Sequence, residues 1–151
     1  MKNLLVALLS ITLIFTACEK EEEITTLPVT TTSYDFSCKV GGDVFTDNSP
    51  VVVIDPSSNV LTIDAENGGN TIRIIIYNFS DRNVGDEISL NNPTDKAYVT
   101  KDGVDYTNTQ SGKIIFTKTS SELSGTFNFT SKAADFSSKS VTEGVFVDLT
   151  Y

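Results

Sequence analysis

Regular alternation of apolar and polar residues from position 34 onward is the feature that most constrains the fold. Residues 123–130 (Leu-Ser-Gly-Thr-Phe-Asn-Phe-Thr) place apolar residues or glycine between hydroxyl and amide side chains, without a single charge. Successive side chains of a β-strand point to opposite faces, so this pattern predicts a half-buried antiparallel strand. Residues 34–40 repeat it, and only 132–136 offers about one turn of helical periodicity. The sequence therefore predicts an all-β protein.

Glycine-containing turns separate the alternating segments. Gly41-Gly42, Gly68-Gly69 and residues 101–103 each stand between two apolar stretches, which is typical of tight hairpins. We expect an antiparallel β-sandwich or barrel of about 8–10 strands connected mainly by hairpins. Alternation is the same in a sandwich and in a barrel, so both architectures stay open.

Three segments carry more specific expectations. Residues 71–79 are apolar on both faces, which predicts a central strand that is covered on both sides. Residues 108–112 are polar and are expected to form a loop before a strand at 113–118. Gly144 predicts a bulge or bend within the last strand, residues 141–151.

The N-terminal residues have the features of an export signal. Lys2 precedes an almost unbroken apolar run over residues 4–17, which is short for a bilayer span and typical of a signal-peptide core. Cys18 follows, and four of the next five residues are glutamate. This arrangement resembles a bacterial lipoprotein signal, which implies cleavage before Cys18 and fatty-acyl groups on its sulfur and new amino group. An ordinary secretory signal with an incidental cysteine is the alternative.

These features divide the chain into a signal peptide (1–17), a lipidated cysteine with an acidic, threonine-rich tether (18–33) and a single β-domain (34–151). The acidic run beside Cys18 resembles the export signal of surface-displayed lipoproteins of the Bacteroidota. The resemblance implies a protein that is lipid-anchored in the outer membrane and faces the cell surface.

The β-domain also shows a family resemblance. Residues 123–129, residues 141–146, a closing Tyr151 and Phe36 ahead of the Gly41-Gly42 turn are similar to a family of small Bacteroidota lipoproteins. The C-terminal all-β domain of that family has no assigned function. Its motifs are glycines at bends and aromatic residues on a core face, so the resemblance implies no catalytic residue.

Composition excludes several classes of function. The formal net charge of -9 disfavours nucleic acid and anionic lipid surfaces as partners. The chain has no histidine, which removes Ser-His-Asp and Cys-His catalysis and the usual zinc, copper and haem sites. If Cys18 is acylated, Cys38 has no disulfide partner, and its place in an alternating segment predicts a small buried residue. We expect no catalytic residue, cofactor or metal, and a protein that is not an enzyme.

Carboxylates are the remaining candidates for chemistry. A carboxylate-based hydrolase is the remote alternative for the function. It would need two acids that face each other across a cleft, and the candidate pairs are Asp64 with Glu66 and Asp86 with Glu87. Residues 102–105 place two aspartates around a glycine but lack the spacing of a dedicated calcium loop. A simple turn is the preferred interpretation of that segment.

Two interpretations of function remain. The first is a non-catalytic binding or structural module, held to the membrane by its lipid and binding an unknown protein or surface polymer. The second is a carrier of a small apolar ligand or glycan in a lipocalin-like barrel. Tryptophan, a common sugar-stacking residue, is absent, but Tyr98 and Tyr106 could stack on a sugar ring.

Overall fold

The computed structural model describes residues 35–151. The expected signal peptide, Cys18, the tether and Tyr34 lie outside the described residues. Eleven strands and one short 3-10 helix are present: β1 (Phe36–Val40), β2 (Asp43–Asp47), β3 (Val51–Asp55), β4 (Val60–Asn67), β5 (Asn70–Tyr77), η1 (Phe79–Asp81), β6 (Glu87–Ser89), β7 (Lys96–Lys101), β8 (Val104–Tyr106), β9 (Asn108–Lys118), β10 (Glu122–Lys132) and β11 (Ser138–Thr150). The all-β prediction is confirmed, with one strand more in residues 35–151 than the upper end of the expected range of 8–10.

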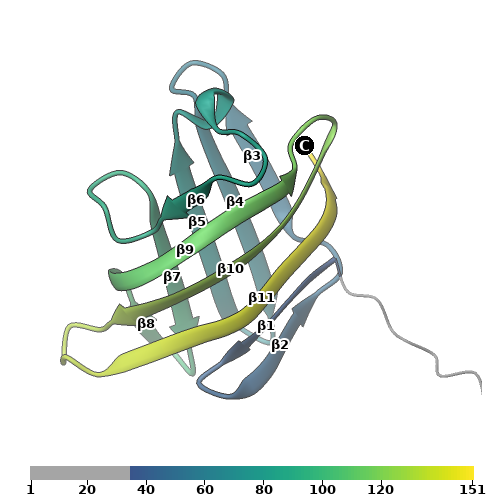
Figure 1. Ribbon diagram of the computed structural model, residues 1–151. Helices are drawn as coiled ribbons and strands as arrows, with labels where there is room; N and C mark the ends of the chain where they lie inside the picture. Colours follow the sequence, from purple (N-terminus) through teal and green to yellow (C-terminus); the bar gives the residue numbers. More distant parts are fainter. Residues whose placement is uncertain (1–34) are drawn as a thin grey trace, which may run out of the picture. The chain divides into compact units, whose positions relative to one another are not determined.

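The strands form two antiparallel sheets that pack as a sandwich (Figure 1). The six-stranded sheet has the order β2-β1-β11-β10-β9-β6, and the five-stranded sheet has the order β3-β4-β5-β7-β8. The sheets do not close into a barrel, so the sandwich is the correct one of the two expected architectures. No helix among the described residues is long and apolar enough to cross a membrane.

The predicted hairpin turns are present. Gly41-Gly42 joins β1 to β2, Gly68-Gly69 joins β4 to β5, and Asp102-Gly103 joins β7 to β8. Both central residues of each turn have positive φ, the conformation of the two-residue type I′ turn that matches the twist of paired strands. The turns fix the register of each hairpin and therefore decide which side chains face inward.

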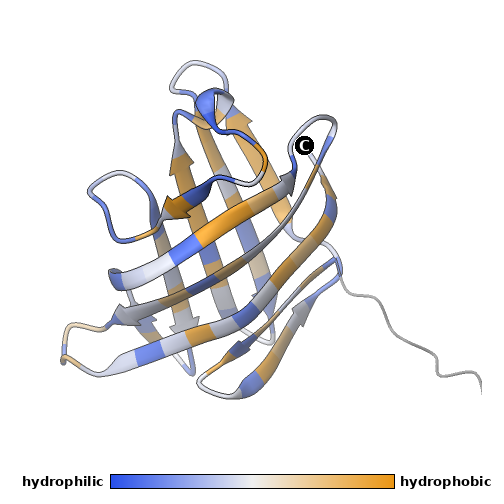
Figure 2. Ribbon diagram, in the orientation of Figure 1, coloured by the Kyte–Doolittle hydropathy of each residue, from blue (hydrophilic) through white to orange (hydrophobic). Residues whose placement is uncertain are grey.

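β5 lies in the middle of the five-stranded sheet, as predicted for residues 71–79. Ile72, Ile74 and Ile76 are buried between the sheets, where Figure 2 shows apolar residues along the strand. The expectation that β5 is covered on both sides is wrong: Arg73 is exposed on the opposite face, and Tyr77 there is 40% exposed. Only one face of this sheet is needed to build the core, which leaves the other face open.

The six-stranded sheet is packed by pairs of phenylalanine and glycine on neighbouring strands. The pairs are Gly125 with Phe146, Gly144 with Phe127, and Gly112 with Phe129. A Cβ atom on any of these glycines would lie 2.4–2.6 Å from an atom of its partner phenylalanine. Glycine is therefore required here so that an aromatic side chain can lie against the neighbouring backbone.

β11 is bent by irregularities in its pairing. Its register shifts against both β1 and β10 near Glu143, which has a φ of 53°. A second shift against β10 accompanies Asp148, with a φ of 50°. The first of these β-bulges is centred one residue from the predicted site at Gly144.

One further local expectation is wrong. Residues 108–112 continue β9 instead of forming a loop, because they pair with the end of β10. That pairing satisfies their backbone groups even though their side chains are polar. Residues 132–136 form no helix: Lys132 ends β10, and the chain then turns toward β11 with a hydrogen bond from the Phe136 amide to the Ala133 carbonyl.

Candidate functional site

The face of the five-stranded sheet that points away from the six-stranded sheet, here called the outer face, carries acidic, basic, hydroxyl and aromatic side chains on neighbouring strands. The antiparallel register places Asp64 of β4 beside Arg73 of β5, and Arg73 beside Tyr98 of β7. Neighbouring strands are about 4.8 Å apart, so these three side chains form a continuous row across the sheet.

A second row runs parallel to the first. Glu66 pairs with Thr71, Thr71 with Thr100, and Thr100 with Asp105, so that four strands contribute one outward side chain each. The two rows are separated by one inward-facing residue on each strand, because the side chains of a strand alternate between faces. Hairpin register thus brings together residues that are far apart in the sequence.

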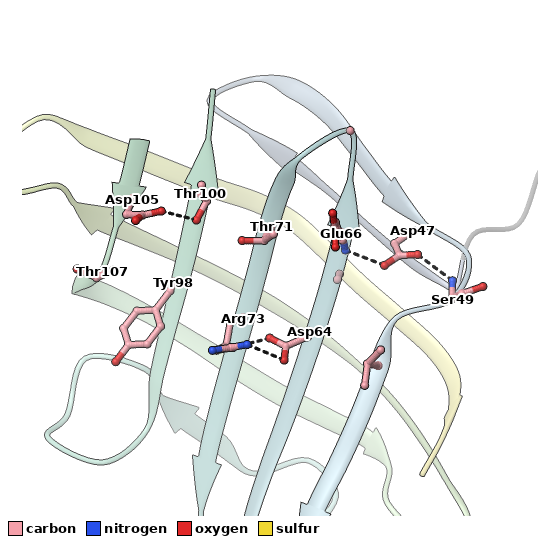
Figure 3. Close-up of a pocket in the computed structure, with 13 residues that line it drawn as sticks. Asp47, Ser49, Asp64, Glu66, Thr71, Arg73, Tyr98, Thr100, Asp105 and Thr107 are labelled. Atoms are coloured by element: carbon pink, nitrogen blue, oxygen red, sulfur yellow. Dashed lines mark hydrogen bonds and ion pairs between the residues drawn. The ribbon is translucent and has the colours of Figure 1, made fainter. Parts of the chain in front are cut away.

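The two rows line an open hollow of about 800 Å³, here called the first hollow (Figure 3). A second hollow of about 390 Å³ is lined by Lys96, Asn108 and Thr107 among others. Tyr98 borders both hollows. Each volume falls within the range of about 300–1,000 Å³ that is typical of small-molecule sites.

Arg73 and Asp64 form a bidentate ion pair. The Arg73 Nε donates to Asp64 Oδ1 at 2.6 Å, and Nη2 donates to Oδ2 at 3.0 Å. The hydrogen bond to Asp64 is the first cause, and its negative charge the second, of the raised pKa of Arg73. Because both side chains are partly exposed, the pair contributes little to stability, about 1 kcal/mol at most. Its effect is to hold the guanidinium in a fixed orientation.

Several polar groups in the first hollow have no partner within residues 35–151. No hydrogen bond in that part of the chain engages the hydroxyls of Thr71, Tyr98 and Thr107 or the carboxylate of Glu66. Asp105 differs, since it accepts a hydrogen bond of 2.7 Å from the Thr100 hydroxyl. The hollow therefore combines oriented and uncommitted donors and acceptors.

The structure places the two carboxylate pairs considered from the sequence in different surroundings. Asp64 and Glu66 both line the first hollow, but Asp64 is bound to Arg73. Asp86 accepts from the side chain and backbone of Asn83, whereas Glu87 accepts from Lys113 at 2.7 Å. The structure does not direct Asp86 and Glu87 at a common point.

The Asp102–Asp105 segment is a hairpin turn, as preferred. Asp105 faces the first hollow, while the Asp102 carboxylate lies 3.7 Å from the Lys101 amine. Within residues 35–151 no group of three or more acidic or cysteine side chains is placed to hold a metal ion.

The two tyrosines proposed for sugar stacking lie on opposite faces of their sheet. Tyr106 is only 7% exposed and packs in the core, so it cannot stack on a ligand. Tyr98 is half-buried and borders the hollows. Cys38 is buried, as predicted, and burial raises the pKa of its thiol to about 12.

Sequence reasoning missed Arg73. Its signal is a single charged residue inside the apolar stretch Ile72-Arg73-Ile74-Ile75-Ile76. A charge at that position must face solvent, because an unpaired buried guanidinium would be strongly destabilising. The open face of β5 could have been inferred from this residue.

A comparison with protein-family models gives a match over most of the chain. A family model described as a domain of unknown function (DUF6252) matches residues 32–150. A search of curated proteins and a search of solved structures gave no match.

Proposed function

We propose that this chain, which belongs to the DUF6252 family, is a lipid-anchored lipoprotein of a Bacteroidota cell envelope that binds a partner at the cell surface. Its β-sandwich is a non-catalytic binding module, and the outer face of the five-stranded sheet is the binding surface. The partner is a surface polymer or a protein.

The support for the anchor lies in the sequence around Cys18. A short apolar run, two small residues and a cysteine precede an acidic segment. Each buried methylene of an acyl chain contributes about 0.8 kcal/mol, so two or more chains give durable attachment. The acidic residues after Cys18 support display on the outer surface by their resemblance to an export signal.

The single observation that carries the binding role is the composition of the outer face. Uncommitted hydroxyls and a carboxylate surround an oriented guanidinium and a half-buried tyrosine in an open hollow. A concave surface with a few convergent polar groups beside an aromatic side chain is a candidate binding site.

Metabolic labelling with an alkyne fatty acid tests the anchor. We expect the wild-type protein to be labelled, Cys18→Ala to lose the label, and the control Cys38→Ala to keep it. Equal labelling of Cys18→Ala would contradict lipidation at this residue. Surface biotinylation of intact cells tests display: replacing the glutamates of residues 19–23 with alanine should reduce surface labelling while lipidation persists.

Binding to cell-envelope preparations tests the choice of surface. Thr71→Lys combined with Thr100→Lys should weaken co-sedimentation, because two long charged side chains would fill the first hollow. The matched control is Thr126→Lys, on the exposed side of the six-stranded sheet. If the control weakens binding as much as the double variant, the outer face is not the binding surface.

A further inference from the structure

We propose that the outer face binds an uncharged glycan chain, with Tyr98 as the stacking platform between the first and second hollows. This inference deepens the proposed function and rests on it. It names the chemical class of the partner, a hydroxyl-rich neutral polysaccharide, and gives individual residues of the face a role.

The placement of Tyr98 provides the first argument. A sugar ring has an apolar face of C–H groups and a rim of hydroxyls, so it is recognised by an aromatic face with polar groups beside it. The Tyr98 ring lies along the outer face, with its hydroxyl end pointing away from β7 (Figure 3). Because the residue is half-buried on a strand, part of its conformational freedom is already lost before a ligand binds.

The polar groups around the ring provide the second argument. A sugar hydroxyl is both donor and acceptor, and it is best satisfied where both kinds of group are in reach. On the side of the first hollow, the Arg73 guanidinium donates, while the Asp64 carboxylate holds it in place. On the side of the second hollow, Lys96 and Asn108 supply further polar groups. Thr107 lines both hollows.

The arrangement of the two hollows favours a chain over a single sugar. Both hollows are open, and Tyr98 is a shared wall. A polymer lying across Tyr98 can place one unit against the ring and its neighbours in the hollows on either side. The volumes of about 800 and 390 Å³ leave room for such neighbours.

Charge decides between neutral and acidic glycans. Four carboxylates line the first hollow, those of Asp47, Asp64, Glu66 and Asp105. The positive groups are fewer: the Arg73 guanidinium in the first hollow and the Lys96 amine in the second. The whole chain is also acidic. Uronate or sulfate groups would therefore be repelled from this face, whereas uncharged sugars would not.

The test is affinity electrophoresis and calorimetry of the full-length lipidated protein in mild detergent. The neutral probes are a soluble β-glucan, a mannan, a xylan and a dextran; the acidic probes are polygalacturonate and heparin. We expect binding to at least one neutral polymer and none to the acidic ones. Tyr98→Ala should weaken binding about tenfold or more, the usual effect of losing a central aromatic anchor.

Tyr77→Ala is the matched control, because Tyr77 is an exposed tyrosine on the outer face but lines neither hollow. It should bind like wild type, and Tyr98→Phe should retain most binding because it keeps the ring. Thermal unfolding establishes that each variant is folded.

The inference is overturned if wild type binds none of the neutral polymers, if it prefers the acidic ones, or if Tyr98→Ala binds no more weakly than Tyr77→Ala. Suppose that wild type binds no glycan but that the Thr71→Lys, Thr100→Lys variant still loses envelope binding. The proposed function then stands, and the envelope component that the outer face binds is a protein. If envelope binding is also insensitive to that variant, the outer face has no binding role.

Discussion

The two sheets of the sandwich bury different kinds of residue. The inner face of the six-stranded sheet is rich in phenylalanine: Phe127 lies with its ring centroid 5.0 Å from that of Phe36 and 6.3 Å from that of Phe146. The inner face of β4 and β5 is aliphatic and dominated by isoleucine. Large flat rings need glycine on the adjacent strand, whereas isoleucine fills its space without one. The aromatic sheet is therefore more sensitive to added atoms.

The exposed faces of the two sheets differ in how their charged side chains are paired. On the six-stranded sheet charged groups bind one another across strands: Lys39 with Glu143, Lys113 with Glu87, and Lys118 with both Glu122 and Asp148. In the two rows of the outer face, within residues 35–151, the one ion pair is that of Asp64 with Arg73, both in the first row. Within residues 35–151, more of the charged groups are therefore paired on the exposed side of the six-stranded sheet than in the two rows of the outer face. The predictions below test this division, from the largest expected effect to the smallest.

Truncating Phe127 should have the largest effect. Phe127→Ala removes a ring that packs against three other phenylalanines and covers Gly144, so we expect a loss of about 4 kcal/mol in the free energy of unfolding. Urea unfolding followed by circular dichroism measures it. A loss below about 1 kcal/mol would mean that the aromatic cluster is not the main packing feature of this sheet.

Adding a methyl group to Gly125 should cost somewhat less. Its Cβ would lie 2.5 Å from both the Ile115 carbonyl oxygen and the Phe146 ring, so Gly125→Ala should destabilise by about 3 kcal/mol. Gly69→Ala lies in the β4–β5 turn, with open space around it. It should lower the free energy of unfolding by only about 1 kcal/mol, because the positive φ is the one source of strain there. Equal effects of the two substitutions would show that close packing between the strands is not what requires Gly125.

A buried carboxylate supports the edge of the outer face. Asp95 is 1% exposed and accepts hydrogen bonds of 2.8 Å from the Tyr77 amide and from Arg82 Nη2. Asp95→Asn removes the negative charge beside Arg82 and should destabilise by about 2 kcal/mol. The exposed Asp81→Asn is the control, with an expected change within about 0.5 kcal/mol. The same loss in both variants would contradict a specific role for Asp95.

The smallest effect concerns acid stability at the β3–β4 turn. Hydrogen bonds from the side chains of Ser57 and Ser58 lower the pKa of Asp55 from 3.8 to about 2. Its contribution to stability is therefore complete above pH 3.8 and is lost as the pH falls through about 2. Between pH 3.8 and about 2, the melting temperature of Asp55→Asn should fall slightly less than that of wild type, because asparagine does not titrate. Thermal unfolding across this pH range measures the difference. An unchanged profile would contradict the lowered pKa.

Much of the fold could be predicted because strand alternation and two-residue turns are local features. Gly68-Gly69 between two alternating segments predicts a hairpin whatever the rest of the chain does. The choice between sandwich and barrel depends on distant pairings, such as β1 with β11, which no local pattern encodes. The covering of β5 was mispredicted because Ile75 and Tyr77 looked like a second buried face; both lie outward on an open sheet instead.

The candidate site was predictable only in part. Asp64 and Tyr98 were singled out from the sequence, but for different reasons and without Arg73 between them. The two residues flank Arg73 because β7 pairs with β5 after the chain has passed through η1 and through β6, a strand of the other sheet. No local pattern in residues 78–95 predicts that return, although Asp95 binds the Tyr77 amide at the end of β5 once the chain is folded. The combination of groups in the first hollow is therefore a property of the folded sheet.

The central claim is that the five-stranded sheet provides the binding surface and the six-stranded sheet provides the scaffold. Its most direct test is a backbone NMR titration of the full-length protein with the neutral polysaccharide that it binds best. We expect the largest shift changes at Arg73, Tyr98 and Thr107. Residues of β10 and β11 should change little. Changes concentrated on β10 and β11, or spread evenly over both sheets, would contradict the account.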